Sequence, residues 1–346
     1  MIEAGCERIF DMSAHAAMLL GAFRATRKGL QMLRASSKYL ENGRFDAVVL
    51  LDSPTLHLPL AKKAKKLGLP VLYYIAPQLW AWGAWRIGKV RRRVDELAVI
   101  FPFEEAYYRK RGVPATFVGH PLGDDLAAQS ADEDAIARLR KLGQPLVALL
   151  PGSRKHVVEA IAKDQLHMAA QIRNAFPSSA FAVSIANPSV APIISEAVRT
   201  APVAVKTVDG SIATLVRAAD LVLVASGTTT LQVAMLGRPM VVMYKASRLA
   251  YQLVGRWLIR SPYLSLPNIL AGREIVPEFM PYYSSVEPIA EKAVELLGSE
   301  DVRSSMIEDL NRVTQSLRAP GASMNTARLL LNLVDRSRAA SSPKGL

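Results

Sequence analysis

The sequence predicts an α/β fold with two parallel sheets. Short apolar runs alternate with helical segments along most of the chain, which is the pattern of parallel strands joined by crossover helices. This alternation starts again at Pro145, after a polar stretch at 123–143, so two sheets are expected. Several runs end in small or polar residues, and ligands of parallel sheets bind beyond the carboxyl ends of the strands. Function is therefore expected at these turns.

The domain boundaries follow from the two series of alternating strands and helices, the first before Pro145 and the second from Pro145 onward. We expect an N-terminal α/β domain at 1–144 and a second α/β domain at 145–300. Helices at 301–335 close the chain and could pack back on the first domain, and 336–346 is expected to be a frayed tail. The expected strands are 45–52, 69–75, 97–100 and 116–122 in the first series and 146–150, 180–185, 203–205, 221–224 and 240–244 in the second.

Composition limits the possible functions. Lys and Arg total 43 against 30 Asp and Glu, a net charge of +13, which suits anionic partners such as nucleic acid, a phospholipid surface or phosphorylated substrates. No apolar run reaches the roughly 18–20 residues of a membrane span, and no secretory signal is visible. A single cysteine favours a reducing cytosol. The histidines and the cysteine have no ligand spacing, so we expect no metal, and we expect no cofactor.

The segment from Ala14 to Leu40 reads as one or two helices. Its first part, 16–23, is apolar on every face, and basic residues follow. This pattern is typical of a protein that rests on an anionic membrane without crossing it, although a helix buried between domains is the commoner explanation. The candidate membrane or acceptor contacts are Met18, Leu19, Leu20 and Phe23.

Three features of the first series are candidate site residues. Asp52 ends a strand and is placed where a catalytic acid or base would lie, although a helix cap is also common there. Trp80 and Trp82 lie beside Arg86, and such aromatic faces bind sugars, acyl chains or bases. His120 follows a strand in a Gly-His-Pro turn, as a ligand contact or a structural residue.

Two small-residue turns in the second series suit phosphate. One is Pro151-Gly152-Ser153-Arg154, and a guanidinium there could form a bidentate phosphate contact. The other is Ser226-Gly227-Thr228, between the run at 221–224 and a helix, and a helix N-terminus binds anions. An ordinary βα turn is an equal alternative for this second turn taken alone. The chain contains neither a G-x-x-x-x-G-K-[ST] loop nor a G-x-G-x-x-G motif.

Six motifs together resemble segments of bacterial lipid-A-disaccharide synthases, in the same order. The resemblance runs from the first residues to about Leu333. The motifs are Asp52-Ser53-Pro54, the run at 77–82, the run at 117–122, the run at 149–154, Ala225-Ser226-Gly227-Thr228 and the loop at 266–272.

The resemblance implies a GT-B fold with two Rossmann-like domains, and a metal-independent inverting glycosyltransferase. The family joins UDP-2,3-diacylglucosamine to 2,3-diacylglucosamine 1-phosphate and releases UDP. It implies Asp52 as catalytic base and Arg154 as stabiliser of the diphosphate. It also implies a cytoplasmic protein on the anionic inner face of the membrane, with no nucleic-acid partner; a homodimer is possible. The implied UDP-sugar contacts are Ser153, Arg154, Ser226, Gly227, Thr228, Gln232, Asn268 and Glu278.

The chain departs from the family pattern at three places. The family's first strand and its Gly-Glu-x-Ser-Gly-Asp turn match nothing here, so we expect the first N-terminal strand to be missing. Gln232 replaces a glutamate that holds the ribose hydroxyls in related enzymes. Thr55, His57 and Val157 replace the usual Asp, Asn and Glu. Two alternatives stay open, another UDP-sugar enzyme such as an epimerase or the muramyl-lipid transferase, and a non-catalytic remnant that binds membrane or nucleotide.

Overall fold

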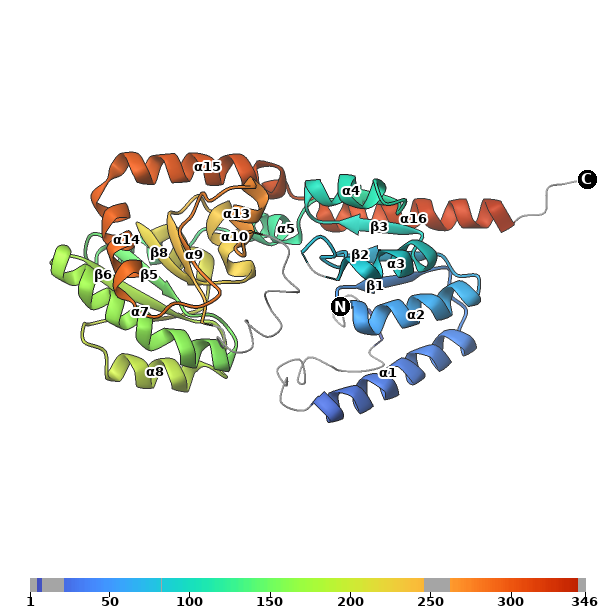
Figure 1. The fold of residues 1–346 in the computed structure, drawn as a ribbon, viewed down its shortest axis with the longest axis horizontal. Coiled ribbons are helices and arrows are strands. Elements are labelled where there is room, and N and C mark those ends of the chain that lie inside the picture. The colour runs from blue at the N-terminus through green and yellow to red at the C-terminus, as the bar shows by residue number, and fades with distance from the viewer. Residues whose placement is uncertain (1–4, 8–21, 82, 246–261, 342–346) are drawn as a thin grey trace, which may run out of the picture. The chain divides into compact units, whose positions relative to one another are not determined.

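Two separate parallel sheets organise the chain, in agreement with the predicted fold class (Figure 1). The structure is a computed structural model that describes residues 5–7, 22–81, 83–245 and 262–341. Contacts divide the chain into two units, of which unit 1 comprises Met1–Pro121 and Pro320–Leu346 and unit 2 comprises Leu122–Ala319. No helix among the described residues is long and apolar enough to cross a bilayer.

Unit 1 contains a four-stranded sheet with the order β1-β2-β3-β4. Its central strands are buried because helices cover both faces of the sheet, the face that carries Tyr73 and the opposite face that carries Leu72. The strands are β1 (Val48–Leu51), β2 (Val71–Tyr74), β3 (Glu96–Val99) and β4 (Ala115–Phe117), and the helices are α1 (Ala22–Asn42), α2 (Pro54–Lys66), the 3-10 turn η3 (Ala84–Arg86), α3 (Ile87–Arg93), α4 (Pro102–Arg109) and α16 (Ala322–Ser341).

Helix α16 brings the end of the chain onto the sheet of unit 1, alongside β2 and β3 (Figure 1). Leu333 packs against Leu72, Ala98 and Val118, and Asn325 donates a hydrogen bond to the carbonyl of Val118 at 3.0 Å. The helix continues to Ser341, so most of the tail expected at 336–346 is helical. Arg338 forms an ion pair with Asp46 at 2.6 Å, which ties this last part to the unit.

Unit 2 contains a six-stranded sheet with the order β10-β9-β8-β5-β6-β7. Strands β5, β8 and β9 are buried along their whole length, which explains their uniformly apolar sequences. The chain runs outward from β5 to β7, then returns to the other side of β5 to form β8. The strands are β5 (Leu146–Leu150), β6 (Ala180–Ile185), β7 (Lys206–Asp209), β8 (Leu221–Ala225), β9 (Met240–Met243) and β10 (Glu278–Phe279).

The helices of unit 2 include two that were expected with the first domain. α6 packs on α9, and Arg140 donates to the carbonyl of Arg217 at 3.2 Å, so the contacts place 122–144 in unit 2 rather than in unit 1. The helices are α5 (Pro121–Ala128), α6 (Glu133–Arg140), α7 (Lys155–Ala175), α8 (Ala191–Arg199), α9 (Ile212–Ala218), α10 (Thr228–Met235), α13 (Leu266–Ala271), α14 (Glu287–Gly298) and α15 (Glu300–Arg318).

Two local expectations were wrong. The strand expected at 203–205 is β7, at Lys206–Asp209, which pairs only with β6. An edge strand exposes much of its surface, so its polar sequence is tolerated, while Val203 and Val205 pack against the core before the strand begins. The loop expected at 266–272 contains helix α13, which has Pro267 in its first turn, where a missing N–H costs nothing.

Candidate functional site

The two small-residue turns of unit 2 lie side by side at the topological switch point of the sheet. β5 pairs with β8 in parallel, Leu150 opposite Val224, so the turns that follow these strands are neighbours. Gly152 has φ +107°, and a Cβ there would lie 3.7 Å from Cβ of Ala225. The switch point is where open α/β sheets bind their ligands. The sheet order therefore brings together the two turns that the sequence selected.

The turn after β8 presents the N-terminus of α10. Gly227 has φ +147° and caps the helix, and both Gly227 and Thr228 are exposed. The Ser226 N–H donates to the carbonyl of Met243 at 2.9 Å, and the Thr230 hydroxyl donates to the carbonyl of Gly227 at 2.8 Å. These bonds fix the turn, and the Thr230 N–H also donates to the carbonyl of Gly227 at 3.1 Å. The N–H groups of Thr228 and Thr229 have no partner among the residues that the structure describes and can receive an anion.

The turn after β5 presents a cation to the same part of the sheet. Ser153 and Arg154 are exposed, and Arg154 is the N-cap of α7. Asn187, in the turn after β6, donates to the carbonyl of Ser153 at 2.9 Å, and its oxygen accepts from the Ser189 N–H at 3.0 Å. Asn187 was not among the residues expected from the sequence, although a polar residue just after a strand is the same signal that selected Asp52.

Asn268 and Glu278 were expected on the nucleotide sugar, and the structure places them in a closed network. Asn268 is fully buried; its amide donates to Glu278 and to the carbonyl of Val276, both at 2.9 Å, and its oxygen accepts from the N–H groups of Ile275 and Val276. Glu278 also accepts from the N–H groups of Leu264 and Ser265, both at 3.0 Å. In this arrangement the pair holds the backbone around α13.

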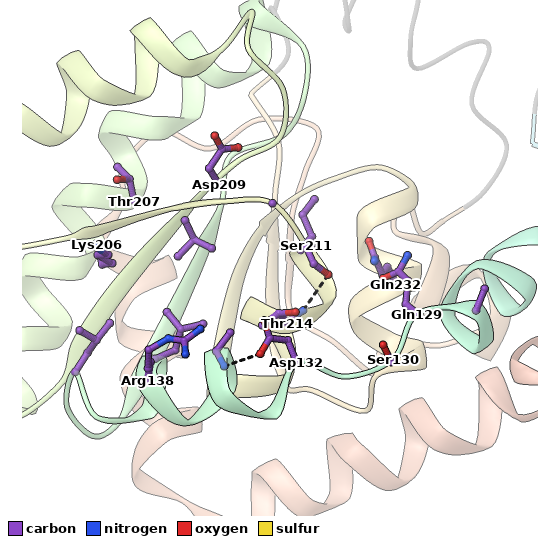
Figure 2. A pocket seen from close by; sticks show the side chains of 17 residues that line it. Gln129, Ser130, Asp132, Arg138, Lys206, Thr207, Asp209, Ser211, Thr214 and Gln232 are labelled. Carbon is purple, nitrogen blue, oxygen red and sulfur yellow. Dashed lines mark hydrogen bonds between the residues drawn. The ribbon is translucent and has the colours of Figure 1, made fainter.

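Gln232 lines a pocket of about 1030 Å³ in unit 2, whose lining is part polar and part apolar. Figure 2 shows Gln232 and Gln129 together at one end, with Arg138 and Lys206 at the other. Ser211, in the turn after β7, also lines the pocket, and its hydroxyl caps α9 by accepting from the Thr214 N–H at 3.4 Å (Figure 2). Gln232 thus faces space large enough for part of a nucleotide.

Unit 1 places Asp52 directly after β1, as expected, with its side chain exposed. The residue has φ +56°, an uncommon conformation outside glycine, and the turn is held because Tyr73 donates its hydroxyl hydrogen to the carbonyl of Asp52. His57 lies on the following helix, where burial lowers its pKa and the neighbouring Leu51 carbonyl and Asp52 charge oppose that shift. At neutral pH an uncharged imidazole therefore lies near the Asp52 carboxylate.

Trp80 and His120 lie at the same carboxyl edge of unit 1, after β2 and β4. The indole N–H of Trp80 donates to Glu104 at 2.9 Å. His120 is buried against Phe101, with ring centroids 5.4 Å apart, and burial lowers its pKa to about 4. His120 is thus neutral at pH 7 and cannot bind phosphate by charge.

The remaining candidates fall outside the described part of the chain. Met18, Leu19, Leu20 and Trp82 are not among the described residues. Phe23 belongs to α1, but its side chain is not described.

Two Rossmann-like units with parallel sheets, and phosphate-type turns at a switch point, define the GT-B class of fold. Solved structures agree. The chain matches a putative UDP-N-acetylglucosamine 2-epimerase from Listeria monocytogenes with a TM-score of 0.59 at 11% identity, over 93% of this chain and 81% of that one. It matches S. aureus MnaA, in a co-structure with UDP, with a TM-score of 0.61 at 10% identity, over 89% and 82%. At these identities the likeness shows the fold alone.

Sequence comparison identifies the family. The family model described as lipid-A-disaccharide synthetase matches residues 1–329. A lipid-A-disaccharide synthase of Syntrophus aciditrophicus (strain SB) is 37% identical over 322 residues, which cover 92% of this chain and 81% of the relative. The chain belongs to the lipid-A-disaccharide synthetase family.

Proposed function

We propose that this chain transfers a 2,3-diacylglucosamine unit from UDP to 2,3-diacylglucosamine 1-phosphate, with release of UDP. The observation that carries the proposal is the meeting of the Ser153-Arg154 and Ser226-Gly227-Thr228 turns at the switch point of unit 2, in a chain of this family. A single small-residue turn is common in α/β proteins. Two such turns on adjacent strands, one with an exposed arginine, match what a diphosphate needs.

Unit 2 would hold the donor. The diphosphate would receive hydrogen bonds from the first turn of α10 and from the guanidinium of Arg154, which stabilise the charge that develops as UDP leaves. We infer that the ribose lies towards Gln232, in the pocket that this residue lines. S. aureus MnaA, which shares the fold, was solved together with UDP. Asn268 would act on the donor only through the backbone that it holds.

Unit 1 would activate the acceptor. In this reaction the acceptor's 6-hydroxyl attacks the donor's C1, the bond from C1 to the diphosphate oxygen breaks, and the configuration at C1 inverts. The hydroxyl proton goes to a base, and Asp52 is the exposed carboxylate at the carboxyl edge of this sheet that the family motif also selects.

The test is a turnover assay with radiolabelled UDP-diacylglucosamine and its 1-phosphate acceptor. Asp52→Asn should lose at least about 10²-fold in kcat, since a positioned base typically contributes that much. UDP binding, measured by calorimetry, should stay at the wild-type value. Asp46→Asn is a matched control, because this aspartate lies before the same strand and pairs with Arg338. Wild-type turnover by Asp52→Asn would exclude the base assignment, and an inactive wild-type chain would exclude the proposed reaction.

We also infer that unit 1 rests on an anionic phospholipid surface. Trp85 is 64% exposed, and exposed tryptophans favour the interface between headgroups and acyl chains. Lys62 and Lys66 on α2, with Lys89 and Arg92 on α3, are exposed and form no ion pair with any residue that the structure describes. Unpaired lysines and arginines near a surface each contribute about 1 kcal/mol of attraction to anionic lipid.

Vesicle sedimentation separates the two parts of this inference. Lys62→Glu with Lys66→Glu should reduce binding to phosphatidylglycerol vesicles and make the remainder less dependent on salt. Leu19→Glu with Leu20→Glu tests the apolar segment in the same assay. Unchanged sedimentation in both double variants would show that the membrane surface lies elsewhere.

A further inference from the structure

Glu104 is a buried carboxylate that the proposed reaction does not use. Its residue is 1% exposed, and burial raises its pKa to about 7. Burying a carboxylate is costly unless every lone pair finds a partner, so a retained one calls for an explanation. Glu104 lies in the first turn of α4, together with Pro102, Phe103 and Glu105.

The two oxygens of Glu104 have different partners. Oε2 accepts from the N–H groups of Ile100 at 3.2 Å and Phe101 at 3.1 Å, which caps the start of α4. Oε1 accepts from the indole N–H of Trp80 at 2.9 Å. The helix cap needs only one oxygen acceptor. Among the described residues, Trp80 is the one that requires the second oxygen.

A second contact from α4 holds the same loop. Tyr108 lies one helical turn after Glu104 and is fully buried, and its hydroxyl donates to the carbonyl of Pro77. The ring of Trp80 packs edge-on against Phe103, with centroids 5.0 Å apart. Helix α4 therefore fixes the segment from Pro77 to Trp80 at its backbone, its ring and its indole N–H.

The held indole lies where a ligand of unit 1 would bind. Asp52, the segment from Ile75 to Trp80, and His120 follow β1, β2 and β4, so they share the carboxyl edge of one parallel sheet. Trp80 is only half-buried. The face of an indole suits the C–H face of a sugar ring, and the bond to Glu104 sets the orientation of this indole.

We propose that Glu104 is a positioning residue that orients the indole of Trp80 as one wall of the acceptor-sugar site. This rests on the proposed function, because the ligand is the diacylglucosamine 1-phosphate of that reaction. Glu104 itself does not touch the substrate. It acts by keeping an unprotonated oxygen towards the indole N–H.

Glu104→Gln separates the cap from the anchor. Glutamine has one carbonyl oxygen, which can still accept from Ile100 and Phe101, but its amide N–H₂ then faces the indole N–H, donor against donor. Trp80→Phe breaks the same bond from the other side and keeps an aromatic ring. Glu105→Gln is the control, because it removes a charge from the same helical turn, where Glu105 instead pairs with Arg109 and accepts from the Phe117 N–H.

The first readout does not need turnover. With Trp82, Trp85 and Trp257 replaced by phenylalanine, Trp80 is the sole tryptophan among the 4 in the sequence. Its emission reports both the indole environment and the binding of diacylglucosamine 1-phosphate in mixed micelles. Glu104→Gln should shift this emission to longer wavelength and weaken acceptor binding about tenfold, which is close to the usual net loss for one hydrogen bond. Glu105→Gln should change neither.

The second readout is the split of kinetic parameters in the otherwise unmodified chain. Glu104→Gln and Trp80→Phe should each raise KM for the acceptor and leave KM for the UDP-sugar unchanged, and the double variant should be no worse than either single one. Additive effects, or unchanged acceptor binding in Glu104→Gln, would refute the positioning role. Acceptor binding that depends on Glu104 in a chain without turnover would refute the proposed reaction and leave the positioning role standing.

Discussion

The burial of Glu104 predicts that unit 1 becomes less stable as pH rises through neutrality. The pKa of Glu104 is raised to about 7 in the folded chain, mainly by burial, from its ordinary value of 4.5. Between these values the folded state binds a proton that the unfolded state has released. Stability therefore falls as pH rises, and the protonated, more stable state is fully present only below about pH 4.5.

The size of the effect follows from the two pKa values. With about 7 in the folded state and 4.5 in the unfolded state, the linkage relation gives a loss of about 2.5 kcal/mol between pH 5 and pH 8. His120 acts in the opposite direction, because burial lowers its pKa to about 4 and its protonation on acidification favours unfolding. Tyr108, an ionisable group beside Glu104, has its pKa raised by burial and stays neutral in this range. The total pH profile therefore hides the Glu104 contribution.

The difference in stability between wild type and Glu104→Gln isolates the Glu104 contribution. We would follow urea unfolding by tryptophan fluorescence in a Trp257→Phe background, so that the remaining tryptophans all belong to unit 1. The stability of wild type relative to Glu104→Gln should fall by about 2.5 kcal/mol from pH 5 to pH 8, a midpoint difference on the order of 1 M urea. Glu105→Gln should run parallel to wild type. A constant difference between wild type and Glu104→Gln across this range would refute the burial argument.

Two further predictions concern unit 2. Asn268→Ala leaves the buried N–H groups of Ile275 and Val276 without acceptors. The substitution should lower the free energy of unfolding of unit 2 by about 3 kcal/mol, measured by thermal unfolding. A loss below about 1 kcal/mol would show that the loop rearranges. Gln232→Glu offers the ribose hydroxyls a charged acceptor and should tighten UDP binding roughly fivefold by calorimetry, whereas unchanged affinity would place the ribose away from this residue.

The fold was largely predictable because both sheets are parallel and buried. Runs such as Leu146–Leu150 and Leu221–Ala225 are apolar along their whole length, and that pattern leaves little choice of structure. The edge strand Lys206–Asp209 was not predictable in the same way, since an exposed strand carries no apolar signal. The short helix Leu266–Ala271 was missed because its start is fixed by Glu278, a residue distant in sequence whose partners the sequence does not show.

The candidate site was predictable only to the level of which turns take part. The rule that polar residues follow strands selected Arg154, Ser226 and Asp52, and the structure places all three at the carboxyl edges of their sheets. The same rule also fits Asn187, which lies at such an edge and was overlooked. Sequence position alone does not distinguish a residue that contacts a ligand from one that holds the backbone, since both are polar side chains in turns.

Satisfaction of hydrogen bonds makes that distinction. Asn268 is fully buried with both donor hydrogens and its oxygen engaged by the protein, so it has nothing left to offer a ligand without breaking the loop. Arg154 is exposed at a helix start and forms no ion pair with a described residue, so its guanidinium can bind an anion. Glu104 lies between these two cases. It is buried like Asn268, but one of its oxygens accepts a hydrogen bond from a half-exposed indole. A buried polar group that also bonds to a half-exposed side chain can therefore set the orientation of that side chain in a site. For this reason the replacement of Glu104 is the most direct test of the acceptor site proposed in unit 1.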